Sequence, residues 1–107
     1  MHLDTALILN NPEDIATLEG QNVTIHCSGI SNPASNITWL KNGLPIIQGT
    51  NYSFANNIEM LSSYGQLTIY NVQVADEGIY QCKLQNEIGI TLSGNAVVTI
   101  YRKCCFI

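Results

Sequence analysis

Charged residues are scarce in this chain of 107 residues, because Asp, Glu, Lys and Arg together make up only 11% of the sequence. An average globular chain contains about 25% charged residues. The formal net charge is −4, and the four basic residues are Lys41, Lys83, Arg102 and Lys103. Nucleic-acid binding needs basic residues gathered in a patch or stripe. Two isolated lysines and one basic pair do not form such a patch, so we expect no binding to DNA or RNA.

Long apolar runs are also missing. A membrane-spanning helix needs about 20 consecutive apolar residues, and no stretch of the sequence approaches that length, so we expect no membrane insertion by this segment. The sequence has no recognisable signal peptide, since residues 1–4 contain no Lys or Arg and the apolar stretch at residues 6–9 is too short. We therefore expect the chain to be a fragment of a longer protein or the product of an incomplete gene prediction.

Signatures of catalysis and of metal binding are lacking as well. The sequence has no spaced Cys and His pairs of the zinc-binding kind, no glycine-rich phosphate loop and no nucleophile elbow. His26 adjoins Cys27, but neighbouring residues of a strand point to opposite faces. Asp76 and Glu77 are adjacent carboxylates, which we assign to a turn and not to acid–base chemistry. We expect no cofactor, no metal and no enzymatic activity.

Short alternating runs take the place of helical patterns. No segment of ten or more residues has a convincing helical period, and runs separated by Gly, Asn, Pro and Ser are typical of an all-β protein. Asn42-Gly43 indicates a tight hairpin, because both central positions of a type I′ turn need positive φ. We expect a loop over residues 49–57. The first and last strands are interrupted, so we count seven or eight strands, over residues 5–10, 15–19, 22–27, 37–41, 44–48, 58–61, 66–70, 78–85 and 90–101.

Two cysteines and a tryptophan occur in a characteristic order. Trp39 lies twelve residues after Cys27, and Cys82 lies forty-three residues after Trp39. Over residues 5–101 the chain resembles the immunoglobulin superfamily, and in particular its intermediate (I-set) type, which occurs in adhesion molecules and muscle proteins. The spacing between the cysteines is shorter than in variable-type domains. The residues that match the I-set motif are Leu67, Ile69, Asn71, Val72, Asp76, Gly78, Tyr80, Cys82, Asn86 and Gly89.

The resemblance implies an all-β, immunoglobulin-like Greek-key β-sandwich of seven to eight strands in two sheets. It implies an inter-sheet disulfide between Cys27 and Cys82, with Trp39 packed against it. It also implies three segments: a disordered N-terminus at residues 1–4, the domain at residues 5–101, and a tail or linker at residues 102–107.

The resemblance also assigns roles around the second cysteine. Leu67 and Ile69 would face the core. Tyr80 would form a tyrosine corner, with its hydroxyl bonded to the backbone a few residues upstream. Asp76 and Gly78 would shape the turn before the strand, since Asp caps backbone N–H groups and Gly tolerates positive φ.

Three N-glycosylation sequons begin at Asn22, Asn36 and Asn51. We expect all three side chains to face solvent, because the residues that follow the first two face the core and the third falls in the expected loop. N-linked glycans on this chain are therefore a prediction of the sequence.

The sequence ends in Cys104-Cys105-Phe106-Ile107, which has the form of a prenylation box. Prenylation is a cytosolic modification and conflicts with an oxidised sandwich. We therefore favour an artificial chain end or a truncated linker for Cys104 and Cys105, with an intermolecular disulfide as the alternative.

Alternation along the strands also predicts a possible interface on the sheet that contains Trp39 and Tyr80. Many members of the family bind partners through this face, and a mixed apolar and polar patch suits a weak interface. The loops at residues 31–35 and 85–89 are the other candidate contacts. The outward-facing residues are Leu40, Ile79, Gln81, Lys83, Val97 and Thr99.

The two leading hypotheses place the domain on different sides of the membrane. In the first, it is a non-catalytic extracellular recognition or cell-adhesion module of a larger receptor or adhesion protein. It then binds either a different protein or a second copy of itself. In the second, it is an intracellular structural I-set module of a muscle- or cytoskeleton-type protein, with reduced cysteines. The sequons and the cysteine pair favour the first hypothesis, whereas the lack of a signal peptide favours the second. We expect an extracellular or cell-surface location.

Overall fold

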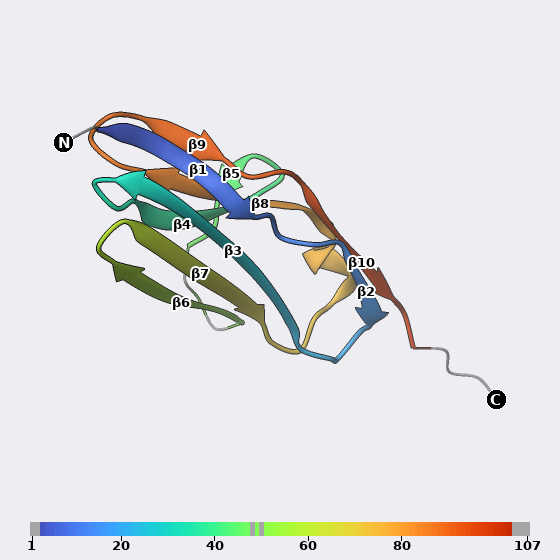
Figure 1. Cartoon of the computed structure of the whole chain (residues 1–107). Coiled ribbons are helices and arrows are strands. Elements are labelled where there is room, and N and C mark those ends of the chain that lie inside the picture. Colours follow the sequence, from blue (N-terminus) through green and yellow to red (C-terminus); the bar gives the residue numbers. More distant parts are fainter. Residues whose placement is uncertain (1–2, 48, 50, 104–107) are drawn as a thin grey trace.

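A computed structural model describes residues 3–47, 49 and 51–103, which form ten β-strands and one short 3-10 helix (Figure 1). If β1 with β2 and β9 with β10 are each counted as one interrupted strand, the number agrees with the upper expected count of eight. The elements are β1 (Asp4–Asn10), β2 (Ile15–Leu18), β3 (Val23–Asn32), β4 (Asn36–Lys41), β5 (Leu44–Pro45), β6 (Tyr52–Glu59), β7 (Ser62–Ile69), η1 (Val74–Asp76), β8 (Gly78–Gln85), β9 (Ile90–Leu92) and β10 (Ala96–Tyr101).

The strands form two sheets that pack as a sandwich. The first sheet has the order β1-β3-β7-β6, and the second has the order β2-β10-β8-β4-β5, with β9 paired to β8 (Figure 1). All pairings are antiparallel apart from the parallel pairing of β2 with β10. This is the expected all-β immunoglobulin-like architecture.

The core lies between the sheets because alternate residues of the central strands point inward. Cys27 of β3 and Cys82 of β8 form a disulfide with an S–S distance of 2.09 Å, so the expected bond between the sheets is confirmed. Trp39 lies opposite Cys82 in the register of β4 and β8 and is only 1% exposed. The buried core consists of Ala6, Val23, Ile25, Cys27, Ile37, Trp39, Leu67, Ile69, Val72, Tyr80, Cys82, Leu84, Ala96, Val98 and Ile100.

The first strand crosses from one sheet to the other at its interruption. β1 starts at Asp4, one residue before the expected boundary, and pairs with β3, whereas β2 pairs with β10. Asn11 Oδ1 accepts a hydrogen bond from the Gly94 N–H at 2.8 Å, and Asp14 Oδ1 accepts one from the Val97 N–H at 2.8 Å. The crossing segment is thus tied to the start of β10, a contact that the sequence pattern does not predict.

The hairpin of β6 and β7 corrects two expectations. The expected loop over residues 49–57 is wrong from Tyr52 onward, where β6 begins. The expected short strand over residues 58–61 is only the end of this longer strand, which pairs with β7 in unbroken register as far as Glu59. The Ser and Asn residues of this segment resemble a loop in composition. They are tolerated because most of β6 is exposed and its pairing with β7 supplies the backbone hydrogen bonds.

Gly43, in the turn between β4 and β5, and Gly78, at the start of β8, have different roles. The expected Asn42-Gly43 turn is confirmed, because both residues have positive φ, 51° and 83°. Gly78 does not have positive φ, so the turn does not use the tolerance of glycine for that region. A Cβ atom at Gly78 would lie only 2.9 Å from Asn42 Oδ1, which accepts a hydrogen bond from the Ile79 N–H. This position therefore needs glycine for space.

The tyrosine corner precedes β8, as expected. Tyr80 Oη donates to the Asp76 carbonyl oxygen at 2.6 Å. The Asp76 carboxylate accepts hydrogen bonds from the Gln73 N–H at 2.8 Å and from Tyr52 Oη at 3.3 Å, so it caps the turn and also anchors β6. Burial raises the pKa of Tyr80, and the neighbouring Tyr52 and Asp76 raise that pKa further.

Removal of the disulfide tests how strongly it stabilises the sandwich. The bridged cysteines are separated by 55 residues, so the Cys27→Ala, Cys82→Ala double variant should lower the free energy of unfolding by about 4 kcal/mol through the greater entropy of the unfolded chain. Urea unfolding followed by Trp39 fluorescence measures this change. Equal unfolding midpoints for the parent and the double variant would contradict the prediction.

Tyr80→Phe should lower the free energy of unfolding by about 1–3 kcal/mol, because the buried Asp76 carbonyl loses its donor. An unfolded tyrosine titrates near pH 10, whereas folded Tyr80 keeps its proton to higher pH, so the parent loses stability as the pH rises above about 10. The variant should lose less stability over that range.

Urea unfolding at neutral and alkaline pH measures both effects of Tyr80→Phe. Tyr70→Phe is the matched control, because Tyr70 is 45% exposed and loss of its hydroxyl should leave stability at neutral pH unchanged. The same alkaline slope in the parent and in Tyr80→Phe would contradict the role assigned to Tyr80.

Candidate functional site

The outer face of the second sheet presents the predicted interface residues on β8 and β10. Ile79 and Val97 lie directly opposite each other in the register of these strands and are 41% and 43% exposed. Gln81, Lys83 and Thr99 are half-buried at the outward positions that alternate with core residues. Five of the six predicted residues therefore share one accessible sheet face.

Leu40 is the exception, and its expected exposure is wrong. Its side chain is 8% exposed, although it lies outside the buried core cluster. β4 lies between β8 and β5, so Leu40 has Gln81 on one side and Pro45 on the other. These flanking residues shield it, and Leu40 supports the face without being available to a partner.

Two exposed residues of β9 extend the face and were missed in the sequence. Leu92 lies opposite Lys83, and Ile90 lies opposite Gln85, so both point outward with their partners on β8. They are 49% and 53% exposed. Residues 93–95 interrupt the last strand, so the alternation of inward and outward residues in β9 does not continue into β10. The outward position of Ile90 and Leu92 can therefore be predicted only if β9 is considered separately from β10. We define the apolar stripe as Ile79, Ile90, Leu92 and Val97.

Polar contacts fix the geometry of this stripe. Ser93 Oγ accepts a hydrogen bond from the Cys82 N–H at 2.9 Å, and Gln81 Nε2 donates to the Ser93 carbonyl oxygen at 2.9 Å. The break between β9 and β10 is thereby held against β8. Lys83 lies between Thr38 and Leu92 in register and places a positive charge beside the stripe.

The three sequons differ in their surroundings. Asn36 is exposed at the start of β4 and lies opposite Gln85, so it is on the same outer face as the apolar stripe. Asn22 is also exposed, and its Oδ1 accepts a hydrogen bond from the Asn71 N–H at 3.0 Å. Asn51 is half-buried, and its Nδ2 donates to Asp76 Oδ1 at 3.5 Å, which differs from the fully exposed loop position expected.

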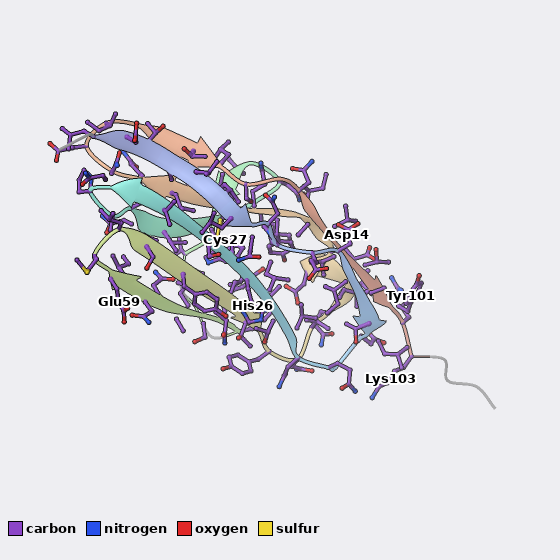
Figure 2. The ribbon with its side chains drawn as sticks, in the orientation of Figure 1. Asp14, His26, Cys27, Glu59, Tyr101 and Lys103 are labelled. Carbon is purple, nitrogen blue, oxygen red and sulfur yellow. A yellow bond between two sulfur atoms is a disulfide. The ribbon has the colours of Figure 1, made fainter. Side chains whose placement is uncertain are left out.

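The residues considered for chemistry have structural contacts. Asp76 caps the turn, while Glu77 Oε2 accepts a hydrogen bond from the Ile100 N–H at 2.8 Å, so the two carboxylates have separate partners. His26 is exposed on the first sheet (Figure 2). Its Nδ1 is hydrogen-bonded to Tyr64 Oη at 2.6 Å. Within residues 3–47, 49 and 51–103, no three His, Cys, Asp or Glu side chains gather as metal ligands. Cys104 and Cys105 lie outside the described residues.

No helix in the described part of the chain is both long enough and apolar enough to cross a bilayer.

Comparison with known proteins gives consistent matches. A family model described as an immunoglobulin domain matches residues 7–86. The chain is 36% identical over 77 residues to contactin-1 of Bos taurus, which covers 72% of this chain and 7% of contactin-1. It is 34% identical over 82 residues to neural cell adhesion molecule L1.1 of Danio rerio, which covers 77% of this chain and 6% of that protein. The chain thus spans less than a tenth of the length of these curated relatives.

Solved structures with the same architecture come from different kinds of protein. A chain in the complex of Dpr2 Ig1-Ig2 with DIP-Theta Ig1-Ig3 aligns with a TM-score of 0.85 at 25% identity, over 92% of this chain and 33% of that chain. Titin M4 aligns with a TM-score of 0.83 at 18% identity, over 94% of this chain and all of that chain (100%). The titin match supports the fold alone. The family match over most of the chain, together with the disulfide-linked sandwich, shows that this chain belongs to the immunoglobulin domain family.

Proposed function

We propose that this chain is a non-catalytic, extracellular protein-recognition domain of I-set type, and that it belongs to a larger receptor or adhesion protein. It binds another protein through the outer face of the second sheet. The observation that favours this function most is the apolar stripe on that face, bordered by polar residues, because exposed apolar patches with polar rims are typical of protein–protein interfaces.

The relatives support the same proposal. One of them is by its name a neural cell adhesion molecule, and the Dpr2 structure contains immunoglobulin domains of two different proteins in one complex. The start of β1 and the end of β10 lie at opposite ends of the sandwich in Figure 1, an arrangement that allows domains to follow one another along a chain. That arrangement suits adhesion proteins and muscle filament proteins equally, so location has to be tested separately.

N-linked glycans form part of the proposal, and the contacts rank the sequons. Asn36 is the most suitable acceptor, because it is exposed, whereas Asn51 is half-buried and its amide donates to the Asp76 carboxylate. A glycan on Asn36 would stand beside Gln85 and Ile90, at the β9 end of the binding face. The partner would then contact mainly the part of the stripe formed by Ile79 and Val97.

The oxidation state of the cysteines distinguishes the extracellular function from an intracellular structural one. We expect natively produced protein, alkylated under denaturing conditions without reductant, to be labelled on Cys104 and Cys105 only. Intact mass measures the number of labels, and a reduced sample with four labels is the control. Labelling of Cys27 and Cys82 in the native sample would instead support the intracellular structural module.

Substitutions on the stripe test the binding face itself. Ile79→Lys and Val97→Lys each place a charge at the centre of the interface and should weaken binding to the partner by at least ~10-fold. Binding of the fluorescently labelled domain to an array of cell-surface ectodomains provides the measurement. Ile30→Lys is the matched control, since Ile30 is also 41% exposed but belongs to the first sheet. Equal binding by Ile79→Lys and the parent would exclude this face.

A further inference from the structure

β6 is a long sheet edge without protection. The sheets end at β1, β6, β2, β5 and the three-residue β9, and each of these edges except β6 is short or covered. β5 has two residues and contains Pro45, β2 has four residues, and β1 is approached by β9, whose Thr91 Oγ1 donates to the Ala6 carbonyl oxygen at 2.9 Å. β6 has eight residues, and Figure 1 shows it as the outermost strand of the first sheet.

The composition of β6 does not discourage pairing with another strand. At an edge strand, the N–H and C=O groups of every second residue point away from the neighbouring strand and can pair with another strand. Natural proteins prevent such pairing with proline, lysine, bulges or short edge strands. The sequence Tyr-Ser-Phe-Ala-Asn-Asn-Ile-Glu has no Pro, Lys or Arg, and its register with β7 is continuous from Tyr52 to Glu59. In the described part of the chain, β7 is the only strand paired with β6.

We propose that β6 pairs antiparallel with β6 of a second copy of this chain, about a two-fold axis at Asn56. In the continuous sheet formed by the two copies, the core-facing residues of both copies lie on the same face. Phe54 of each copy then lies opposite Ile58 of the other copy, so the contact occurs twice. Phe54 is half-buried and Ile58 is 43% exposed, so this pairing covers apolar surface that the single copy leaves in water.

The charges on β6 are compatible with this dimer although the whole chain is acidic. Glu59 is the only charged residue of β6, and Figure 2 shows it at the end of the strand. The antiparallel arrangement places Glu59 opposite Ser53 of the second copy, so the hydroxyl can donate to the carboxylate. The two Glu59 side chains are six residues apart along the strands, about 20 Å, which exceeds the screening length of ~8 Å at physiological salt.

The dimer and the proposed function use different surfaces. β6 belongs to the first sheet, whereas the apolar stripe belongs to the second. Strand pairing at β6 therefore leaves the stripe of both copies accessible, and either proposal can fail without the other.

Analytical ultracentrifugation of the full chain across the micromolar range tests the dimer. Cys104→Ser and Cys105→Ser form the background of every sample, so that the tail cannot cross-link. We expect a reversible dimer in the parent and its loss in Ile58→Lys, because the ammonium group would face Phe54 of the second copy. Ile79→Lys is the matched control and should dimerise like the parent. A monomer at all concentrations, or an undiminished dimer in Ile58→Lys, would overturn the proposal.

Oxidative cross-linking tests the register and does not depend on the lysine variant. At the two-fold axis the Cα atoms of Asn56 and its symmetry mate would be about 4.5–5.5 Å apart, within the range of a disulfide. Asn56→Cys should therefore form a disulfide-linked dimer under mild oxidation. Asn57→Cys should not, because Asn57 lies opposite Ala55. Equal cross-linking of the two variants, or none in Asn56→Cys, would refute the proposed register.

Discussion

The contact between the Cys27–Cys82 disulfide and Trp39 is the constraint on which the other parts of the structure depend. The disulfide joins the central strands of opposite sheets, and Trp39 lies beside Cys82 on the neighbouring strand. The distance between the sheets and the register of β4 with β8 are therefore set at one place. Since strand residues alternate between two faces, that register also decides which side chains of these strands point outward.

Neutral polar side chains hold the strand ends, a role that ion pairs could serve in a more highly charged chain. Asn86 Oδ1 accepts hydrogen bonds from the N–H groups of Ile88 at 3.0 Å and Gly89 at 3.1 Å, and its Nδ2 donates to the Pro33 carbonyl oxygen at 2.9 Å. Asn11 and Asn42 accept hydrogen bonds from backbone groups of distant segments, the N–H groups of Gly94 and Ile79. Amide side chains therefore satisfy backbone groups both within a turn and between segments, in a sequence with only 11% charged residues.

The fold and the function belong to different sets of residues. The buried cluster specifies a sandwich that many proteins use, and it has no bearing on which partner is bound. In the proposed function, recognition depends on outward positions such as Ile79 and Val97, which can change without disturbing the core. The edge strand β6 adds a second outward feature, formed by backbone groups and therefore less dependent on side-chain identity.

The sequence by itself determined the features that depend on local pattern. Alternating apolar residues were sufficient to predict an all-β chain and the whole of β8, and Asn42-Gly43 predicted the hairpin turn. The sandwich and its disulfide were implied by the resemblance to the immunoglobulin superfamily, which the residues Cys27, Trp39 and Cys82 carry. The tyrosine corner followed from the same motif, because all of its atoms lie within five consecutive residues.

Only the tertiary structure decided the features that depend on neighbours distant in sequence. Alternation indicates which side of a strand a residue faces, but not what covers that side, so Leu40 was expected to be exposed although strands on both sides shield it. β6 has the composition of a loop and becomes a strand because β7 supplies its hydrogen bonds. The apolar stripe likewise exists only because β9 and β10 each pair with β8. Long-range packing, and not the local sequence, determines these two pairings.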